Sequence, residues 1–470
     1  MRRPLARLLP ALLLALGSPA FPAIRDAPGV AQVRVEITRR GDTWSAEYVF
    51  DRRVTAWVFP RSDVTRVAGR PWRPDSWIIE TSGVRLERRG RYDVLTAVQG
   101  ELPRRVSLRF QPVAEGLRAD YAPALKFSDG SVALYIGQFD CFPMDSMKAV
   151  ARLPTDLNNH PLPAADVRFV FRDLAGPVLL EGKRSASTET RLDNTYVLFG
   201  GARAIETPDM VAILDPQLPE WIKDSLARSV PVLISRYTQE LGRLRDLRPT
   251  LMATWAGPTP RIVSRSGSVL RGLITLAYEG EGMLMESDAQ RHQGLWFIAH
   301  EAAHFWLGQT VGYEYARDAW ITEGGAELLA FRAVADADPH FDARPDLNRA
   351  IADCIELSRE RGVADARDRG EQRAYYACGT VFGLVAEAGS GRSFYKFVRQ
   401  LVDQNREDGV VTRAEWLAAL DAATRKPALS RDIGQLLDRG AHDPGEFITD
   451  LLVRAGVNIE TDVSGPPTLR

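Results

Sequence analysis

The sequence H-E-A-A-H at residues 300–304 restricts this chain more than any other segment. Residues four apart lie on one face of a helix, so His300 and His304 can offer two imidazoles to one metal ion. Glu301 lies beside them, where a metal-bound water needs a general base. The chain has only six histidines in 470 residues, so a chance match is rare. The segment predicts a metal site, with an ordinary buried helix as the less favoured alternative.

The neighbouring residues favour a helix around this segment. Residues 294–299 contain no proline and are mostly apolar, which is typical of a helix packed in a core. Residues 305–307 continue the apolar run, and Gly308 and Gly312 mark its end. We therefore expect both histidines on a core helix that ends near residue 308.

Glu323 is the candidate third ligand, since eighteen residues separate it from His304. Thr322 can cap a helix that begins there, which would place Glu323 in the first turn. The helix dipole also favours a glutamate in a first turn, so this residue taken alone would not indicate a ligand. Two histidines, one carboxylate and an open fourth position form the ligand set of a catalytic zinc site.

Residues 300–308, 318–320 and 323–324 resemble the zinc-binding stretch of the aminopeptidase N family. These gluzincins carry H-E-x-x-H, eighteen residues, then E. Trp306 and Gly308 match the usual H-x-W-x-G continuation of the family.

The resemblance implies a role for each residue of the motif. His300, His304 and Glu323 would bind one Zn²⁺ ion, and Glu301 would act as the base. The implied substrate is a peptide or a protein.

The same family has a catalytic tyrosine farther along the chain, in a Y-x-K-G pattern. Residues 376–379 (Y-A-C-G) begin fifty-three residues after Glu323, with Cys378 in place of the lysine. The resemblance implies that Tyr376 donates a hydrogen bond to the oxyanion of the tetrahedral intermediate. Tyr375 is the competitor, because adjacent helical residues point about 100° apart and only one can face the metal.

One part of the family pattern is missing. Residues 272–278 predict a strand that resembles the family's edge strand, along which peptide substrates lie. In the family a G-A-M-E-N segment comes just before it, and its glutamate binds the free amino group of the substrate. Residues 266–270 (S-G-S-V-L) have no carboxylate here, so recognition of an amino terminus is not implied. Glu279, Glu281 and Glu286 either replace that glutamate or, as we favour, are solvated loop charges.

A second and weaker resemblance is to the glycyl aminopeptidase family. It shares the W-x-x-E-G and Y-Y-x-x-G patterns at residues 320–324 and 375–379. The spacing from histidine to glutamate fits the aminopeptidase N pattern better. Both resemblances are confined to about residues 250–400.

Residues 1–20 predict a secretory signal peptide. Arginines at the start precede a short apolar run at 8–16 and a small-residue cleavage site at 18–20. The run is too short to span a bilayer, and the sequence shows no other segment of eighteen apolar residues. We expect an exported protein, periplasmic or extracellular, with no transmembrane segment in the mature chain.

The hydrophobic periodicity predicts an α+β multidomain protein. From about residue 30 to 205, short runs alternate at period two between turn signals, and beyond 217 the period changes to that of helices. We expect a signal peptide at 1–20, an all-β domain at 24–205, a thermolysin-like zinc-binding subdomain at 206–345, a helical subdomain at 346–460 and a tail at 461–470. The predicted helices outside the motif are Trp221–Leu241, Arg373–Ala388, Ser393–Gln404 and Glu446–Ala455.

Charge and cysteine content exclude some classes of function. The formal net charge is −1 and arginines alternate with acids, as at 365–373, which indicates a solvated surface and no nucleic-acid binding. Cys141, Cys354 and Cys378 are too few for a disulfide framework. Export permits one bridge, with Cys354 and Cys378 as the favoured pair, and three buried thiols are an equal alternative.

These patterns together predict an exported, aminopeptidase-like zinc metallopeptidase, in which metal-activated water attacks the peptide bond and Glu301 is the base. Asp318 and Glu327 are candidates for carboxylates that orient the histidines, although surface charges are an equal alternative. Two other functions stay open: a non-catalytic binding or scaffold protein that keeps the fold, and an endopeptidase or amidase that does not recognise an amino terminus.

Overall fold

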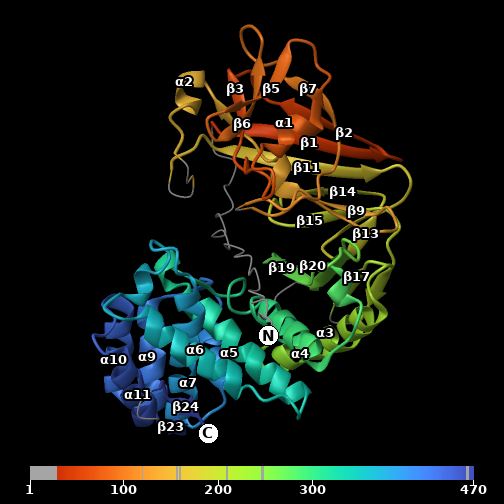
Figure 1. Cartoon of the computed structure of the whole chain (residues 1–470). Helices are drawn as coiled ribbons and strands as arrows, with labels where there is room; N and C mark the ends of the chain where they lie inside the picture. Colours follow the sequence, from red (N-terminus) through yellow and green to blue (C-terminus); the bar gives the residue numbers. More distant parts are fainter. Residues whose placement is uncertain are drawn as a thin grey trace, which may run out of the picture. The chain divides into compact units, whose positions relative to one another are not determined.

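The computed structural model describes residues 29–118, 120–154, 157, 160–207, 210–244, 248–461 and 465–470. The predicted signal peptide lies outside the described residues. The chain divides into two compact units, coloured mainly red to green and cyan to blue in Figure 1. The β unit comprises Met1–Glu220 and Arg248–Leu284, and the helical unit comprises Trp221–Leu247 and Met285–Arg470. The domain boundaries at 205 and 345 stay predictions.

The first sheet of the β unit buries one face and leaves the other accessible to solvent. Its strands, in spatial order, are β14 (Ser187–Thr190), β11 (Ala165–Asp173), β1 (Ala31–Arg40), β2 (Thr43–Phe50), β7 (Arg105–Phe110) and β4 (Trp77–Ile79). In β1, Val33, Val35 and Ile37 are buried, whereas Arg34 and Glu36 between them are partly exposed. The period-two alternation therefore directs apolar side chains into the core.

Two further sheets contribute side chains to the same apolar core. One has the order β10 (Phe142–Met144), β3 (Ala56–Phe59), β6 (Tyr92–Ala97), β5 (Val84–Arg89), and the other β13 (Lys183–Ser185), β12 (Val178–Leu180), β15 (Tyr196–Phe199), β9 (Val132–Tyr135), β8 (Ala124–Lys126). Short helical turns join some of the strands: α1 (Trp72–Ser76), η1 (Ile136–Phe139) and α2 (Met147–Val150). The β-rich N-terminal region confirms that part of the predicted fold class.

A buried ion pair lies inside this β core. Arg73 and Asp93 are both fully buried, and Arg73 Nη1 donates to Asp93 Oδ2 at 2.5 Å. Arg73 Nη2 donates to the carbonyl oxygens of Gln138 and Arg61 at 2.9 and 2.8 Å. Aromatic rings surround the guanidinium at 4.5–5.1 Å from their centroids: Phe59, Trp72 and Trp77. The cation is thus stabilised by the protein itself.

The last sheet of the β unit has the order β16 (Ala204–Glu206), β17 (Val211–Leu214), β18 (Thr250–Trp255), β20 (Leu273–Glu279), β19 (Ser264–Leu270). The predicted strand at residues 272–278 is confirmed, since β20 spans Leu273–Glu279. Its predicted position at the edge of the sheet was wrong, because β19 lies outside it. The chain reverses at Gly272, whose φ of 63° suits a glycine, and β19 pairs antiparallel along the whole of β20.

Helices dominate the helical unit. In chain order they are α3 (Glu220–Leu241), α4 (Asp288–Ala303), α5 (Trp320–Ala337), α6 (Arg344–Leu357), α7 (Arg373–Ser390), α8 (Phe394–Asn405), α9 (Arg413–Thr424), α10 (Pro427–Asp438) and α11 (Pro444–Ala455). Shorter elements are η2 (Glu281–Met283, in the β unit), β21 (Gly312–Tyr313), η3 (Ala316–Asp318), η4 (Val363–Asp365), β22 (Val410–Val411), β23 (Ile459–Glu460) and β24 (Thr468–Leu469). The helical C-terminal half confirms the predicted α+β class.

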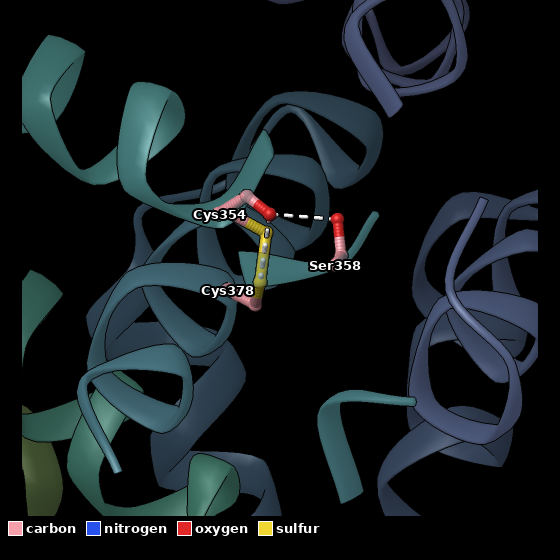
Figure 2. The surroundings of a disulfide bond; sticks show 3 residues. All are labelled: Cys354, Ser358 and Cys378. Atoms are coloured by element: carbon pink, nitrogen blue, oxygen red, sulfur yellow. Dashed lines mark hydrogen bonds between the residues drawn. A yellow bond between two sulfur atoms is a disulfide. The ribbon is translucent and has the colours of Figure 1, made fainter. Parts of the chain in front are cut away.

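One disulfide joins two of these helices. Cys354 on α6 is bonded to Cys378 on α7, as Figure 2 shows. Cys141 is a free and buried thiol in the β unit. The structure thus selects the bridged alternative. Among the helices of the described residues, none is long and apolar enough to cross a membrane.

Candidate metal centre

Helix α4 carries both histidines of the H-E-A-A-H segment near its C-terminal end. The side chain of Ser287 accepts a hydrogen bond from the Gln290 backbone N–H and caps the start of the helix. Its last turns are buried, and His300 is 5% exposed. His304 is the C-cap residue, so the two imidazoles lie one turn apart on the buried side of the helix.

The residues after His304 have a structural reason for their identity. Trp306 Nε1 donates to the Gly242 carbonyl at 2.7 Å, which attaches the end of α4 to the segment after α3. Gly308 has a φ of 141°, and a Cβ atom there would lie 3.2 Å from the His304 carbonyl oxygen and 3.5 Å from its Nδ1. A side chain at Gly308 would therefore press on the His304 carbonyl oxygen, and its φ is one that other residues rarely adopt.

Helix α5 brings Glu323 to the histidines, and helix α7 crosses α5 at the next residue. A Cβ on Gly324 would lie 2.2 Å from the Cα of Gly379, and a Cβ on Gly379 would lie 2.4 Å from the Trp320 carbonyl oxygen. The two backbones are therefore in direct contact, which only glycine permits. Farther along both helices, Arg332 Nε donates to Glu387 Oε2 at 3.1 Å. Glu323 and Tyr376 consequently lie on neighbouring turns of two tightly packed helices.

Three side-chain donor atoms converge at one point of the helical unit. His300 Nε2 and His304 Nε2 are 3.2 Å apart, and Glu323 Oε2 is 3.6 and 3.4 Å from them. These three residues form the group of possible metal ligands that the described residues contain. Zinc with bonds of about 2.0–2.1 Å in a tetrahedron needs donor atoms about 3.3 Å apart. The observed separations therefore suit such an ion.

The other nitrogen of each imidazole is fixed by a hydrogen-bond acceptor. His300 Nδ1 lies 3.0 Å from Glu327 Oε2, and His304 Nδ1 lies 2.8 Å from the Leu307 carbonyl oxygen. Each acceptor requires a proton on Nδ1, so each neutral ring presents a lone pair at Nε2. Two lone pairs and one carboxylate oxygen then face one another, and only a proton or a cation between them stabilises that arrangement.

The pKa shifts of the metal-free protein have the same origin. Burial lowers the pKa of His300, but hydrogen bonds to Glu323 and Glu327 outweigh this and raise that pKa to about 10. Burial raises the pKa of Glu323, but His304 and His300 outweigh it and hold that pKa well below its usual range. The cluster therefore retains a proton where a metal ion would bind, and the two compete for the same lone pairs.

Glu301 is buried next to the two histidines, at 9% exposure. Burial raises the pKa of its carboxyl group, and the charges of His300 and His304 offset only part of this rise. A carboxylate with an increased proton affinity is suited to accept a proton near neutral pH.

Of the two adjacent tyrosines, Tyr376 lies at the donor cluster. Its ring stacks on the His300 imidazole, with centroids 5.7 Å apart and planes at 20°. Burial and the neighbouring Glu323 raise the pKa of its phenol well above the ordinary value, so it stays a proton donor. Tyr375 points elsewhere, because its hydroxyl donates to the Ala364 carbonyl oxygen at 3.0 Å.

Asp318 and Glu327 separate clearly in the structure. Glu327 contacts His300, whereas Asp318 contacts neither histidine, because each Nδ1 has the partner given above. Burial raises the pKa of Asp318, and the arginines at 317 and 413 partly offset it. Its proposed orienting role was wrong: the Leu307 carbonyl takes that place for His304, and a backbone acceptor leaves no signal in a sequence.

Two carboxylates at and after the end of β20 already have hydrogen-bonding or ionic partners. Glu279 accepts a hydrogen bond from the Thr259 hydroxyl at 2.6 Å. Glu286 is exposed and forms an ion pair with Arg291 at 3.2 Å.

A residue that sequence reasoning missed is Tyr313, whose pKa is raised by burial and by the nearby charge of Glu323.

Comparisons with known proteins give a fold and no closer relative. The sequence matches no family model and no curated protein. Native yeast LTA4 hydrolase is similar in structure, with a TM-score of 0.50 and 12% identity over 88% of this chain and 68% of that chain. An M1 zinc metallopeptidase from Deinococcus radiodurans has a TM-score of 0.48 and 15% identity over 87% of this chain and 93% of that chain. The chain therefore shares the fold of the yeast hydrolase.

Proposed function

We propose that this chain is an exported zinc-dependent metallopeptidase that hydrolyses peptide bonds. The observation that carries the proposal is the convergence of His300 Nε2, His304 Nε2 and Glu323 Oε2, each 3.2–3.6 Å from the others. The fixed Nδ1 atoms of both histidines add to it, because they leave no other orientation for the lone pairs. The fold shared with a yeast hydrolase is consistent with it.

The three residues would hold Zn²⁺ through two imidazoles and one carboxylate, with the fourth position left for water or substrate. When bound, zinc supplies a Lewis acid that activates water and polarises the scissile carbonyl. The pKa of Glu301 is raised, so its carboxylate can take a proton from the attacking water and pass it to the leaving amine.

Tyr376 would stabilise the oxyanion that forms as the carbonyl is attacked. Its phenol keeps its proton because its pKa is raised by burial and by Glu323. Its ring is held against His300, so the hydroxyl is positioned before substrate arrives. A fixed donor of this kind is typically worth about 10²–10³-fold in rate.

Substrate recognition is proposed to differ from that of an aminopeptidase. Residues 266–270 lie in β19 and provide no carboxylate for a free amino group. We therefore propose cleavage of peptides whether or not the amino terminus is free, as an endopeptidase would. Export is supported by the disulfide between Cys354 and Cys378, since such bonds persist in oxidising compartments.

The test combines metal content with peptide cleavage. Purified protein should contain one zinc per chain and should cut a peptide library in which each member is present with a free and an acetylated amino terminus. Similar rates for both versions support the endopeptidase proposal, and cleavage of free-amine peptides alone makes the protein an aminopeptidase. Protein without stoichiometric zinc contradicts the whole proposal. Zinc without cleavage makes it a non-catalytic protein with this fold.

A further inference from the structure

Helix α7 is held on two sides next to Tyr376. Cys378, two residues later, is bonded to Cys354 of α6, with Cα atoms 4.8 Å apart and both side chains fully buried. Gly379, the following residue, is in backbone contact with Gly324 of α5. The turn that carries Tyr376 is therefore placed by one covalent bond and one helix crossing.

The partner end of α6 is itself anchored, so it is a fixed reference for the disulfide. The Ser358 hydroxyl donates to the Cys354 carbonyl oxygen at 2.6 Å, as Figure 2 shows. The Ser358 carbonyl oxygen accepts from the Ala441 N–H at 3.0 Å, and the Glu360 N–H donates to the Ala441 carbonyl oxygen at 2.8 Å. These bonds join the C-terminal end of α6 to the segment between α10 and α11.

The disulfide acts on α7 alone among the helices of the metal centre. The candidate ligands come from α4 and α5, and neither helix is bonded to a cysteine. The crossing at Gly324 and Gly379 and the ion pair of Arg332 with Glu387 attach α7 to α5, and the disulfide adds an attachment of α7 to α6.

We propose, building on the peptidase function, that the bond between Cys354 and Cys378 is a positioning element for Tyr376, and that the protein gains full activity only when this bond has formed. The two thiols lose two electrons and two protons to a disulfide donor during folding, and that donor is reduced to two thiols. Both sulfurs are buried afterwards, so oxidation completes the site once and does not switch it reversibly. The dithiol form keeps its metal ligands and loses the register of the phenol.

A double-mutant cycle tests this proposal. The zinc-loaded wild type is compared with C354S/C378S, with Tyr376→Phe and with the triple variant, using one peptide substrate. We expect C354S/C378S to lower kcat by about 10-fold or more, because small misplacements of a catalytic group are costly. KM should change less than about 2-fold and zinc should stay at one per chain, since α4 and α5 are untouched. In the Tyr376→Phe background the cysteine substitutions should have no further effect on kcat.

Cys141→Ser is the matched control, because it removes a buried thiol outside the helical unit and should leave kcat unchanged. An equal loss of kcat in both tyrosine backgrounds, or no loss in either, overturns the proposal. If C354S/C378S does not fold, C354A/C378A takes its place in the same comparison.

Hydrogen exchange of the metal-free protein gives a readout that does not depend on activity. The amides at 376–380 should exchange faster without the disulfide, while those at 298–303 of α4 should be unchanged. Unchanged exchange in α7 overturns the positioning role even if activity falls. Wild-type protein that binds zinc and cuts no peptide contradicts the peptidase function, and exchange alone then decides whether the bond fixes α7.

Discussion

The two units bury charged groups in opposite ways. In the β unit, the Arg73 guanidinium has Asp93, two carbonyl oxygens and three aromatic rings as partners, all from the protein. In the helical unit, two lone pairs and a carboxylate face one another, and the cation that would satisfy them must come from outside. The first arrangement is satisfied within the fold, whereas the second can bind an added ion.

The largest expected effect concerns Glu301, which lies beside the candidate metal ligands. Glu301→Gln should keep one zinc per chain and lower kcat by about 10²–10⁴-fold, because the amide cannot take a proton. Stopped assays with metal analysis measure both quantities. Glu281→Gln is the control, and a Glu301→Gln protein as active as the wild type would exclude Glu301 as the base.

Breaking the buried ion pair of Arg73 and Asp93 should affect stability. Arg73→Met leaves Asp93 buried without this partner and should lower the free energy of unfolding by about 3–5 kcal/mol. Chemical denaturation measures it, with Arg105→Met as control, because the exposed pair of Arg105 with Glu47 contributes less than about 1 kcal/mol. Similar losses in both variants would mean that the buried pair has no special role.

The pH dependence of the metal-free protein sharpens the contrast further. The folded-state pKa of His300 is raised to about 10, above the unfolded value of about 6.5, so its contribution is complete below about pH 6.5 and is lost as the pH rises through 10. Denaturation at pH 6, 8 and 10 should show this decrease in metal-free protein. In zinc-loaded protein and in His300→Gln, the free energy of unfolding should decrease less over that range. Equal decreases in all three proteins would contradict the attribution of the pH dependence to His300.

The smallest effect should come from the residue that orients His300. Glu327→Gln replaces a charged acceptor with a neutral one and should weaken zinc binding by about 10–100-fold. Competition with a chelator measures the affinity. Glu360→Gln, at the exposed pair with His442, should leave it unchanged. If zinc affinity falls by less than tenfold in the Glu327→Gln variant, Glu327 does not strengthen metal binding by His300.

The sequence predicted the parts of the centre that depend on local geometry. His300 and His304 share a helix face because 3.6 residues make a turn, and period-two alternation identified the β-rich half. The choice between Tyr375 and Tyr376 depends on how α7 packs, and no local pattern contains that information. The contact of Gly324 with Gly379 joins residues far apart in the chain. The edge position predicted for residues 272–278 was wrong for a similar reason, because the tertiary structure determines the pairing of β19 with β20.

The zinc-binding roles of His300, His304 and Glu323 stay predictions, and so do the catalytic roles of Glu301 and Tyr376. The spacing brought the right residue types together, but their roles rest on chemistry that the experiments above address. Asp318 illustrates the limit, because its position before α5 suited an orienting carboxylate and a backbone carbonyl at Leu307 fills that place.

The two histidines differ in what evolution or design can alter. His304 is oriented by the carbonyl of Leu307, a group that every amino acid supplies at that position. His300 is oriented by the side chain of Glu327, which a single codon change can replace. Substitution of residue 307 therefore keeps the hydrogen-bond acceptor of His304, whereas substitution of residue 327 changes the acceptor and the basicity of His300. Substitutions at residue 327 alone should yield a graded series of metal affinities on a constant scaffold.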